Sequence, residues 1–281
     1  MKRIAIVGLG LIGGSLGLDL VKQGHPVIGI ARRPETVAAA LALGAATEAG
    51  TDLAQVAGAD VVFICTPIDV TVATAAAIAP HLSPQAVMTD VASVKGEIVP
   101  ALEALWPNTV GGHPMAGKAE AGLAVAEVGL FQNCPYVLTP TAATPPAALE
   151  QMGAIVASLG ANLCHCTPTQ HDRAVAWISH LPVMLSSSLL LACQHEADPT
   201  ILALAQALAS SGFRDTSRVG GGVPELGTLM AQHNRVALLN ALTQYQQQLD
   251  QLKALIAADD WDALHQALTE AHAARPAYVA I

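Results

Sequence analysis

A glycine-rich turn near the start of the chain sets the strongest limit on the fold. Residues 3–8, RIAIVG, form a short β-branched run typical of a buried strand. The segment GLGLIG follows with the spacing G-x-G-x-x-G, and residues 11–24 then carry apolar side chains at helical spacing. A strand, a tight glycine turn and a helix in this order predict the first unit of a parallel α/β sheet.

Each glycine of this turn has its own physical reason. Gly8 permits the sharp turn, Gly10 lets a pyrophosphate approach the backbone, and Gly13 permits close packing of the helix on the strand. The helix N-terminus adds free N–H groups and positive potential. We therefore expect a bound dinucleotide, the alternative being a tight turn without a ligand. The predicted cofactor-binding residues of the turn are Gly8, Leu9, Gly10, Leu11, Ile12 and Gly13.

Strand and helix patterns keep alternating up to residue 167. This alternation predicts a mostly parallel sheet with helices on both faces. Strands are expected near 3–8, 26–32, 59–67, 85–91, 109–112, 134–140 and 161–167, and helices near 11–24, 34–44, 69–80, 94–105 and 146–159.

The pattern changes after Pro168, where the segments carry helical periodicity with few strand candidates. We expect an α/β dinucleotide-binding domain over 1–167 and an all-α domain over 168–281. The helices are rich in Ala and Leu and poor in charge, and they would leave apolar faces exposed in a monomer. We therefore predict a homodimer formed through the helical domain.

Charge and cysteine content limit the partners and the compartment. The formal net charge is -9, without basic clusters, which argues against nucleic acid or an anionic membrane and favours a small-molecule substrate. The apolar N-terminal run is too short to span a bilayer.

The five cysteines form no CxxC pair, and with no secretory signal they indicate reduced thiols in the cytoplasm. Residues 164–166, Cys-His-Cys, read more simply as a strand than as part of a metal site, so no metal is expected.

The end of the second strand indicates which dinucleotide binds. NAD-binding sites usually place an acidic residue there for the ribose 2′-hydroxyl, whereas this chain has Ala31 followed by Arg32 and Arg33. Two guanidinium groups suit a 2′-phosphate. We predict NADP, with NAD at lower affinity; the alternative is that both arginines are solvated surface residues.

Three segments lie at the carboxyl ends of predicted strands, where ligands bind in open α/β sheets: CTPID (65–69), TDVASVKG (89–96) and GGHPMAG (111–117). His113 can accept and return a proton near neutral pH, and Ser93 can exchange a hydrogen bond with a substrate hydroxyl. Alternatively, His113 ties loop carbonyls together and Ser93 caps the following helix. We also assign Cys65, Thr66 and Pro67 to the cofactor site.

Five segments together resemble the prephenate/arogenate dehydrogenase family of tyrosine biosynthesis, and most closely its cyanobacterial-type arogenate dehydrogenases: VGLGLIGGSLGLDL, DVASVKG, GGHPMAG, HDRAVAWISHLP and SSGFRDTSRVGGG. The resemblance covers nearly the whole chain. It implies a Rossmann domain, a helical dimerisation domain, and NADP-dependent oxidative decarboxylation of a cyclohexadienyl substrate.

The resemblance also implies roles for individual residues. His113 would deprotonate the ring hydroxyl, Ser93 would lie beside that hydroxyl and the nicotinamide, and Arg218 would bind a substrate carboxylate, with Arg214 as the alternative. His180, from SHLP, and Gly117 would line the substrate pocket, although His180 also fits an ordinary interior histidine.

The sequence leaves open more than one substrate and more than one class of protein. Some prephenate-preferring relatives carry a histidine where this chain has Val183, which favours arogenate; prephenate, giving 4-hydroxyphenylpyruvate, is the alternative. A β-hydroxyacid dehydrogenase or imine reductase usually has a catalytic lysine on its helical side, but the only lysine after residue 118 is Lys253. The remaining alternative is a non-catalytic dimer that senses NADP(H).

Overall fold

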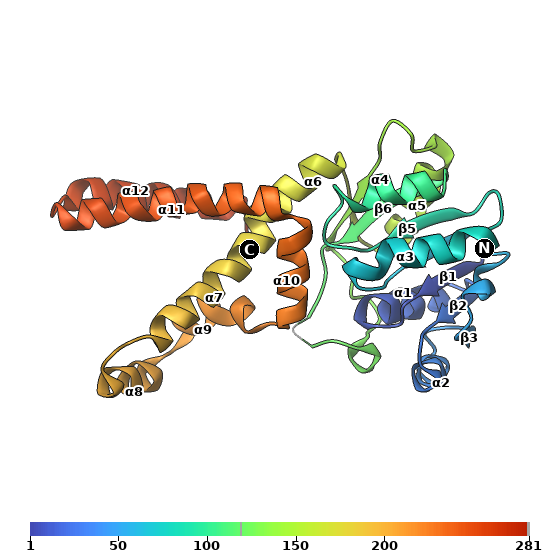
Figure 1. Cartoon of the computed structure of the whole chain (residues 1–281), viewed down its shortest axis with the longest axis horizontal. Helices are drawn as coiled ribbons and strands as arrows, with labels where there is room; N and C mark the ends of the chain where they lie inside the picture. Colours follow the sequence, from blue (N-terminus) through green and yellow to red (C-terminus); the bar gives the residue numbers. More distant parts are fainter. Residues whose placement is uncertain (119, 280–281) are drawn as a thin grey trace. The chain divides into compact units, whose positions relative to one another are not determined.

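The computed structural model describes residues 1–118 and 120–279. It divides into two compact units, Met1–Arg235 and Val236–Ile281. An eight-stranded sheet forms the centre of the first unit, in the order β3-β2-β1-β4-β5-β6-β7-β8 (Figure 1). Its strands are β1 Ile4–Val7, β2 Val27–Ile30, β3 Glu48–Gly50, β4 Val61–Ile64, β5 Val87–Asp90, β6 Thr109–Pro114, β7 Pro135–Thr139 and β8 Asn162–His165.

The topology confirms the predicted Rossmann-type α/β fold. Strands β1 to β6 pair in parallel, with the order reversing beside β1; β6 pairs with β7 in antiparallel orientation, and β7 pairs with β8 in parallel. Ligands bind such sheets at the carboxyl ends of the strands beside the reversal. The short edge strand β3 was not predicted, because three residues carry no readable alternation.

Both faces of the sheet are covered. In β1, Ile4 and Ile6 face one apolar cluster, whereas Ala5 and Val7 face the other. Alternate side chains of a strand point to opposite faces, so an uninterrupted apolar strand indicates two covered faces. The covering helices are α1 Leu11–Lys22, α2 Pro34–Leu43, α3 Ile68–Ile78, α4 Ile98–Leu105 and α5 Pro146–Ser158, with short 3₁₀ turns at η1 Leu53–Val56, η2 Ala79–His81 and η3 Leu123–Val125.

Local signals explain both ends of α2 but not the start of α4. Pro34 occupies the first turn of α2, and Gly44 ends the helix with φ +78°, a conformation that glycine adopts without strain. Helix α4 begins four residues later than the predicted start at 94. The N–H groups of Lys95 and Gly96, just before it, donate instead to a side chain from the helical region, Asp172.

Helices follow the last strand in the remaining part of the first unit. They are α6 Pro168–Val175, the π-helical turn η4 Ala176–His180, α7 Leu181–Gln194, α8 Pro199–Leu208, α9 Ser211–Ser217, the 3₁₀ turn η5 Arg218–Gly221, and α10 Pro224–His233. A capping box fixes the start of α6: Thr167 Oγ1 accepts from Gln170 N at 3.2 Å, and Gln170 Oε1 accepts from Thr167 N at 2.9 Å. Pro182 lacks an N–H and crowds the preceding turn, which explains the π-helical geometry of η4.

The run Pro168–Gln194 is the one described helical run that is long and apolar enough to cross a membrane, and 28% of its most apolar stretch is buried. Length and composition alone do not separate such a helix from one that packs against protein.

The second unit holds α11 Arg235–Ala257, which starts at the last residue of the first unit, α12 Trp261–Ala274 and the turn η6 Arg275–Ala277. The predicted domain boundary at 167/168 stays a prediction, because the two compact units follow a different division.

Candidate active site

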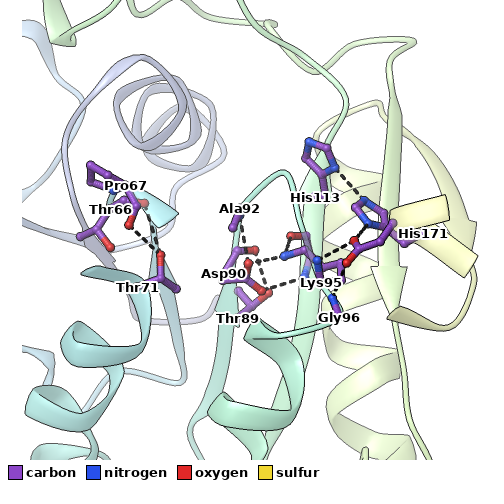
Figure 2. Close-up of polar contacts among 12 residues, drawn as sticks. Thr66, Pro67, Thr71, Thr89, Asp90, Ala92, Lys95, Gly96, His113 and His171 are labelled. Atoms are coloured by element: carbon purple, nitrogen blue, oxygen red, sulfur yellow. Dashed lines mark hydrogen bonds and ion pairs between the residues drawn. The ribbon is translucent and has the colours of Figure 1, made fainter. Parts of the chain in front are cut away.

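The loops after β1, β4, β5 and β6 leave the sheet at the same edge, because these strands run in parallel. The first three carry the glycine turn, Thr66 and Pro67, and the segment that follows Asp90 up to Gly96, while His113 lies near the end of β6 itself. Figure 2 shows the last three groups at this edge, with His113 directed toward His171 of α6.

The glycine turn fits a dinucleotide. A Cβ atom on Gly8, which has φ +104°, would lie 2.5 Å from the Cys65 carbonyl oxygen, so this position requires glycine. A Cβ on Gly10 would meet no described atom within 4 Å, which leaves open space above the backbone. Helix α1 has no side-chain cap and no acidic residue in its first turn. Its N–H groups are therefore free to bind phosphate.

A cavity of about 540 Å³ lies beside the turn. Of the two arginines predicted to bind the cofactor, Arg33 lines this cavity and Arg32 does not. Glu35, in the first turn of α2, also lines it, so a carboxylate is present although none ends the strand itself. The complete lining is Leu9, Gly10, Arg33, Glu35, Thr36, Ala39, Gly122 and Leu123.

The end of β4 offers a further polar group. Thr66 Oγ1 is buried and has no hydrogen-bond partner among the described residues, whereas the neighbouring Thr71 hydroxyl donates to the Pro67 carbonyl at 3.0 Å. A buried hydroxyl without a partner costs free energy unless a ligand satisfies it. The hydroxyl thus fits a polar group of a bound dinucleotide.

A buried ion pair organises the loop after β5. Lys95 Nζ pairs with Asp90 Oδ2, and both side chains are fully buried. The ammonium also donates to the Gly112 carbonyl at 2.7 Å, and Asp90 Oδ2 accepts from Ala92 N at 2.9 Å. Burial lowers the pKa of Lys95, and the Asp90 carboxylate opposes that shift. The pair joins the end of β5 to β6 one residue before His113.

His113 lies in β6, opposite Val137 of β7, so this strand extends beyond the predicted range 109–112. Its ring is buried, and Nδ1 lies 2.8 Å from His171 Nε2. Burial holds the pKa of His113 well below its usual value of 6.5, and the charges of protonated His171, Lys95 and His180 would act in the same direction. The ring is therefore a neutral imidazole at neutral pH, which can accept a proton.

His171 and Asp172 connect α6 to both loops of the site. His171 Nδ1 lies 2.8 Å from Asp172 Oδ1, and the Asp172 carboxylate accepts from Lys95 N at 2.8 Å and from Gly96 N at 2.7 Å. Ser93 lies in the loop that Asp172 holds and is half-buried. It does not cap α4, because the N-cap position is Glu97. No hydrogen bond between Ser93 and His113 is present in the described residues.

His180 lies on the π-helical turn, and its ring is 1% exposed. Asn234 Nδ2 donates to the Asp172 carbonyl at 2.8 Å and lies 3.0 Å from His180 Nδ1. His180 Nδ1 therefore accepts, and Nε2 carries the proton of the neutral ring. Nε2 is buried and has no partner among the described residues, so it is a donor available to a ligand.

Comparison with known proteins decides the family. The family model of the prephenate dehydrogenase nucleotide-binding domain matches residues 16–165, and that of the prephenate dehydrogenase dimerization domain matches residues 167–270. The chain belongs to the prephenate dehydrogenase family. The prephenate dehydrogenase of Bacillus subtilis is 32% identical over 265 residues, which cover 92% of this chain and 71% of that protein.

Two solved structures of this oxidoreductase family are similar over almost their full length. Synechocystis arogenate dehydrogenase shares 51% identity with a TM-score of 0.90, over 99% of this chain and 100% of that one. Prephenate dehydrogenase from Aquifex aeolicus, in complex with hydroxyphenyl propionate and NAD+, shares 28% identity with a TM-score of 0.92, over 98% of this chain and 97% of that one. The resemblance inferred from the sequence is thereby confirmed.

The structure of this prephenate dehydrogenase family member does not bring all predicted residues together. Arg218 and Gly117 are exposed, and Arg214 pairs with its neighbour Asp215 at 3.3 Å. No hydrogen bond or ion pair of Arg218 is present in the described part of the chain, so its role stays a prediction. The described residues hold no group of three or more His, Cys, Asp or Glu side chains that could bind a metal ion.

Four polar residues of the site were not predicted: Lys95, His171, Asp172 and Asn234. The first three are titratable residues in segments that carried the family resemblance. Their place in those segments was the available signal. Asn234 gave none, because it interrupts a run that reads as one long helix.

Proposed function

We propose that this chain is an NADP-dependent arogenate dehydrogenase that converts arogenate to tyrosine with loss of carbon dioxide. The observation that carries the proposal is the buried, neutral imidazole of His113 at the edge of the sheet where a dinucleotide binds. The 51% identity to an arogenate dehydrogenase supports the choice of substrate. Prephenate, with 4-hydroxyphenylpyruvate as product, is the second candidate, since prephenate dehydrogenases also match over most of the chain.

His113 would move the proton of the reaction. A bound nicotinamide would accept the hydride from the ring carbon that bears the hydroxyl. His113 Nε2 takes the hydroxyl proton as the carbonyl forms, and the electron pair of the bond to the leaving carboxylate enters the ring. His113 then returns the proton to the phenolic oxygen, so one substrate gives one aromatic product, one carbon dioxide and one reduced cofactor.

Binding groups for the rest of the substrate follow from charge and burial. Arogenate carries two carboxylates, and we assign one to Arg218, whose planar guanidinium binds a carboxylate through two parallel hydrogen bonds. We assign an acceptor of the substrate to the free Nε2–H donor of His180. Ser93 would hydrogen-bond the reacting hydroxyl, and Gly117 would allow the substrate to approach the backbone.

The cofactor would be held by the glycine turn, Thr66 and Arg33. We propose NADP over NAD because Arg33 lines the cavity at the end of β2 and can pair with a 2′-phosphate. The carboxylate of Glu35 in the same cavity would repel a 2′-phosphate and could instead accept a hydrogen bond from the ribose 2′-hydroxyl of NAD. We therefore propose that NAD also binds, at lower affinity.

We also propose a cytoplasmic homodimer. The match to a dimerization domain supports the dimer, as do exposed apolar side chains on the helices, among them Ile178, Leu191, Leu208 and Val236. Free cysteines support a reducing compartment. A molar mass independent of concentration and equal to one chain would contradict the dimer.

Initial rates of NADPH and NADH formation from arogenate and from prephenate, each with NADP and with NAD, test the proposed function. Fast turnover of arogenate with NADP is expected. Faster turnover of prephenate, or faster turnover with NAD, would contradict the respective assignment. Cofactor binding without turnover in any combination would favour an NADP(H)-sensing dimer.

A further inference from the structure

His171 and Asp172 carry titratable groups that the reaction described above does not use. Both are buried in the first turns of α6, and they connect to His113 through two consecutive hydrogen bonds of 2.8 Å. Hydrogen bonds between two histidines have a direction that depends on which ring nitrogen holds the proton. The contacts of Asp172 determine that direction.

The Asp172 carboxylate receives two N–H groups that can only donate. Lys95 N lies 2.8 Å from Oδ1, and Gly96 N lies 2.7 Å from Oδ2. An ionised carboxylate has no proton to give, so its third partner, His171 Nδ1, must be a donor as well. With a single proton on its ring, His171 then has its lone pair on Nε2.

The direction passes from His171 to His113. His171 Nε2 is an acceptor and lies 2.8 Å from His113 Nδ1, so Nδ1 of His113 carries the proton. The lone pair of the neutral His113 ring is therefore on Nε2. The opposite direction would require a proton on the Asp172 carboxyl group, or a second proton on the His171 ring.

We propose that His171 and Asp172 are positioning residues that fix the tautomer of His113, so that Nε2 is a proton acceptor before any substrate binds. During turnover the new charge on His113 is stabilised through His171 by the Asp172 carboxylate, as in an acid–base triad. Asp172 also binds the backbone of the loop that carries Ser93, through Lys95 N and Gly96 N. One carboxylate thus contacts both the partner of the base and the loop of the hydroxyl.

Neutron diffraction of the deuterium-exchanged protein without substrate tests the tautomer directly. Deuterium is expected on Nδ1 of His171 and on Nδ1 of His113, with none on Nε2 of either ring. Deuterium on Nε2 of either ring would overturn the proposal. This result does not depend on the substrate assignment: inactivity toward arogenate and prephenate with the expected deuterium positions would refute the proposed function alone.

Two variants of His171 test the consequence for turnover, which rests on the proposed function. His171→Leu removes the acceptor for His113 Nδ1, whereas His171→Gln places an amide oxygen near the position of Nε2. We expect His171→Leu to lower kcat at least about 100-fold, and His171→Gln to stay within about 10-fold of the wild type. KM and the Kd for NADPH should change by less than about 3-fold in both.

The groups that face the two rings also affect the pH profile. Lys95, from the loop after β5, and His180, from η4, act on His113, while Asp172 contacts His171. His171→Gln removes the effect of His171 on the pKa of His113 but keeps burial, Lys95 and His180. Its acidic limb of kcat/KM should therefore still lie below pH 6.5. Equal losses of kcat in His171→Leu and His171→Gln, or losses confined to Tm and Kd, would show that His171 has only a structural role and would overturn the proposal. If His171→Leu does not fold, the neutron result alone decides.

Discussion

Lys95 Nζ lies 2.7 Å from the carbonyl oxygen of Gly112, the residue that precedes His113. The same ammonium pairs with Asp90 in a region without solvent exposure. Removing one charge of a buried pair leaves the other without compensation, and this loss usually exceeds the net contribution of the intact pair.

Replacing Lys95 by methionine should therefore lower the free energy of unfolding by about 3–5 kcal/mol, measured by denaturant titration. Arg3→Met is the matched control, because Arg3 pairs with Glu48 at 3.4 Å on the surface and should cost less than about 1 kcal/mol. Similar small losses in both variants would show that the Asp90 charge is relieved in some other way.

The activity should persist into mildly acidic solution. His113 must be neutral to accept a proton, and burial holds its pKa well below 6.5. The acidic limb of kcat/KM, which reports the free enzyme, should therefore fall only at a pH well below 6.5. Initial rates with arogenate between pH 4 and 8, corrected for loss of substrate without enzyme, measure this. A limb centred at 6.5 or above would contradict the buried, neutral base.

Stability should depend on the protonation of His180. Burial lowers its pKa from 6.5 to about 4, so between these values the unfolded chain binds a proton that the folded chain does not. The free energy of unfolding should then fall as the pH is lowered from 6.5 to 4, by up to about 1.4 kcal/mol per pH unit from this residue. His180→Gln should reduce that slope. If the free energy of unfolding of His180→Gln depends on pH as steeply as that of the wild type, groups other than His180 cause the dependence.

Cofactor preference should depend on Arg33 more than on Arg32, because only Arg33 lines the cavity beside the glycine turn. Arg33→Ala should raise the Kd for NADP roughly 10- to 100-fold, the loss expected for hydrogen bonds to a charged group, with little change in the Kd for NAD. Arg32→Ala is the control. A larger effect of Arg32→Ala, or equal losses for both cofactors, would contradict this assignment.

The sequence predicted the α/β part of the fold closely because its signals are local. The glycine turn, the β-branched runs and the pair of Pro34 and Gly44 each act within a few residues. The start of α4 was wrong because Asp172, distant in sequence, takes the N–H groups of Lys95 and Gly96. Strand β6 extends through His113 because it pairs with β7, and a pairing between distant segments leaves no signal in the local sequence.

The candidate site was predicted in part for the same reason. Motif and chemistry pointed to His113, but its partner His171 lies 58 residues away. The role of Asp172 depends on three donors from two segments, and a sequence does not show such a convergence. Single-residue reasoning therefore pointed to His113 but not to the residues that its ring contacts.

The role of His113 is decided by the effect of His113→Asn on turnover and on cofactor binding, determined separately. We expect kcat for arogenate with NADP to fall by about 10²- to 10⁴-fold, while the Kd for NADPH, measured by fluorescence, stays within about 3-fold of the wild type. Unchanged turnover, or a loss explained entirely by weaker NADPH binding, would contradict the role of His113 as the proton acceptor.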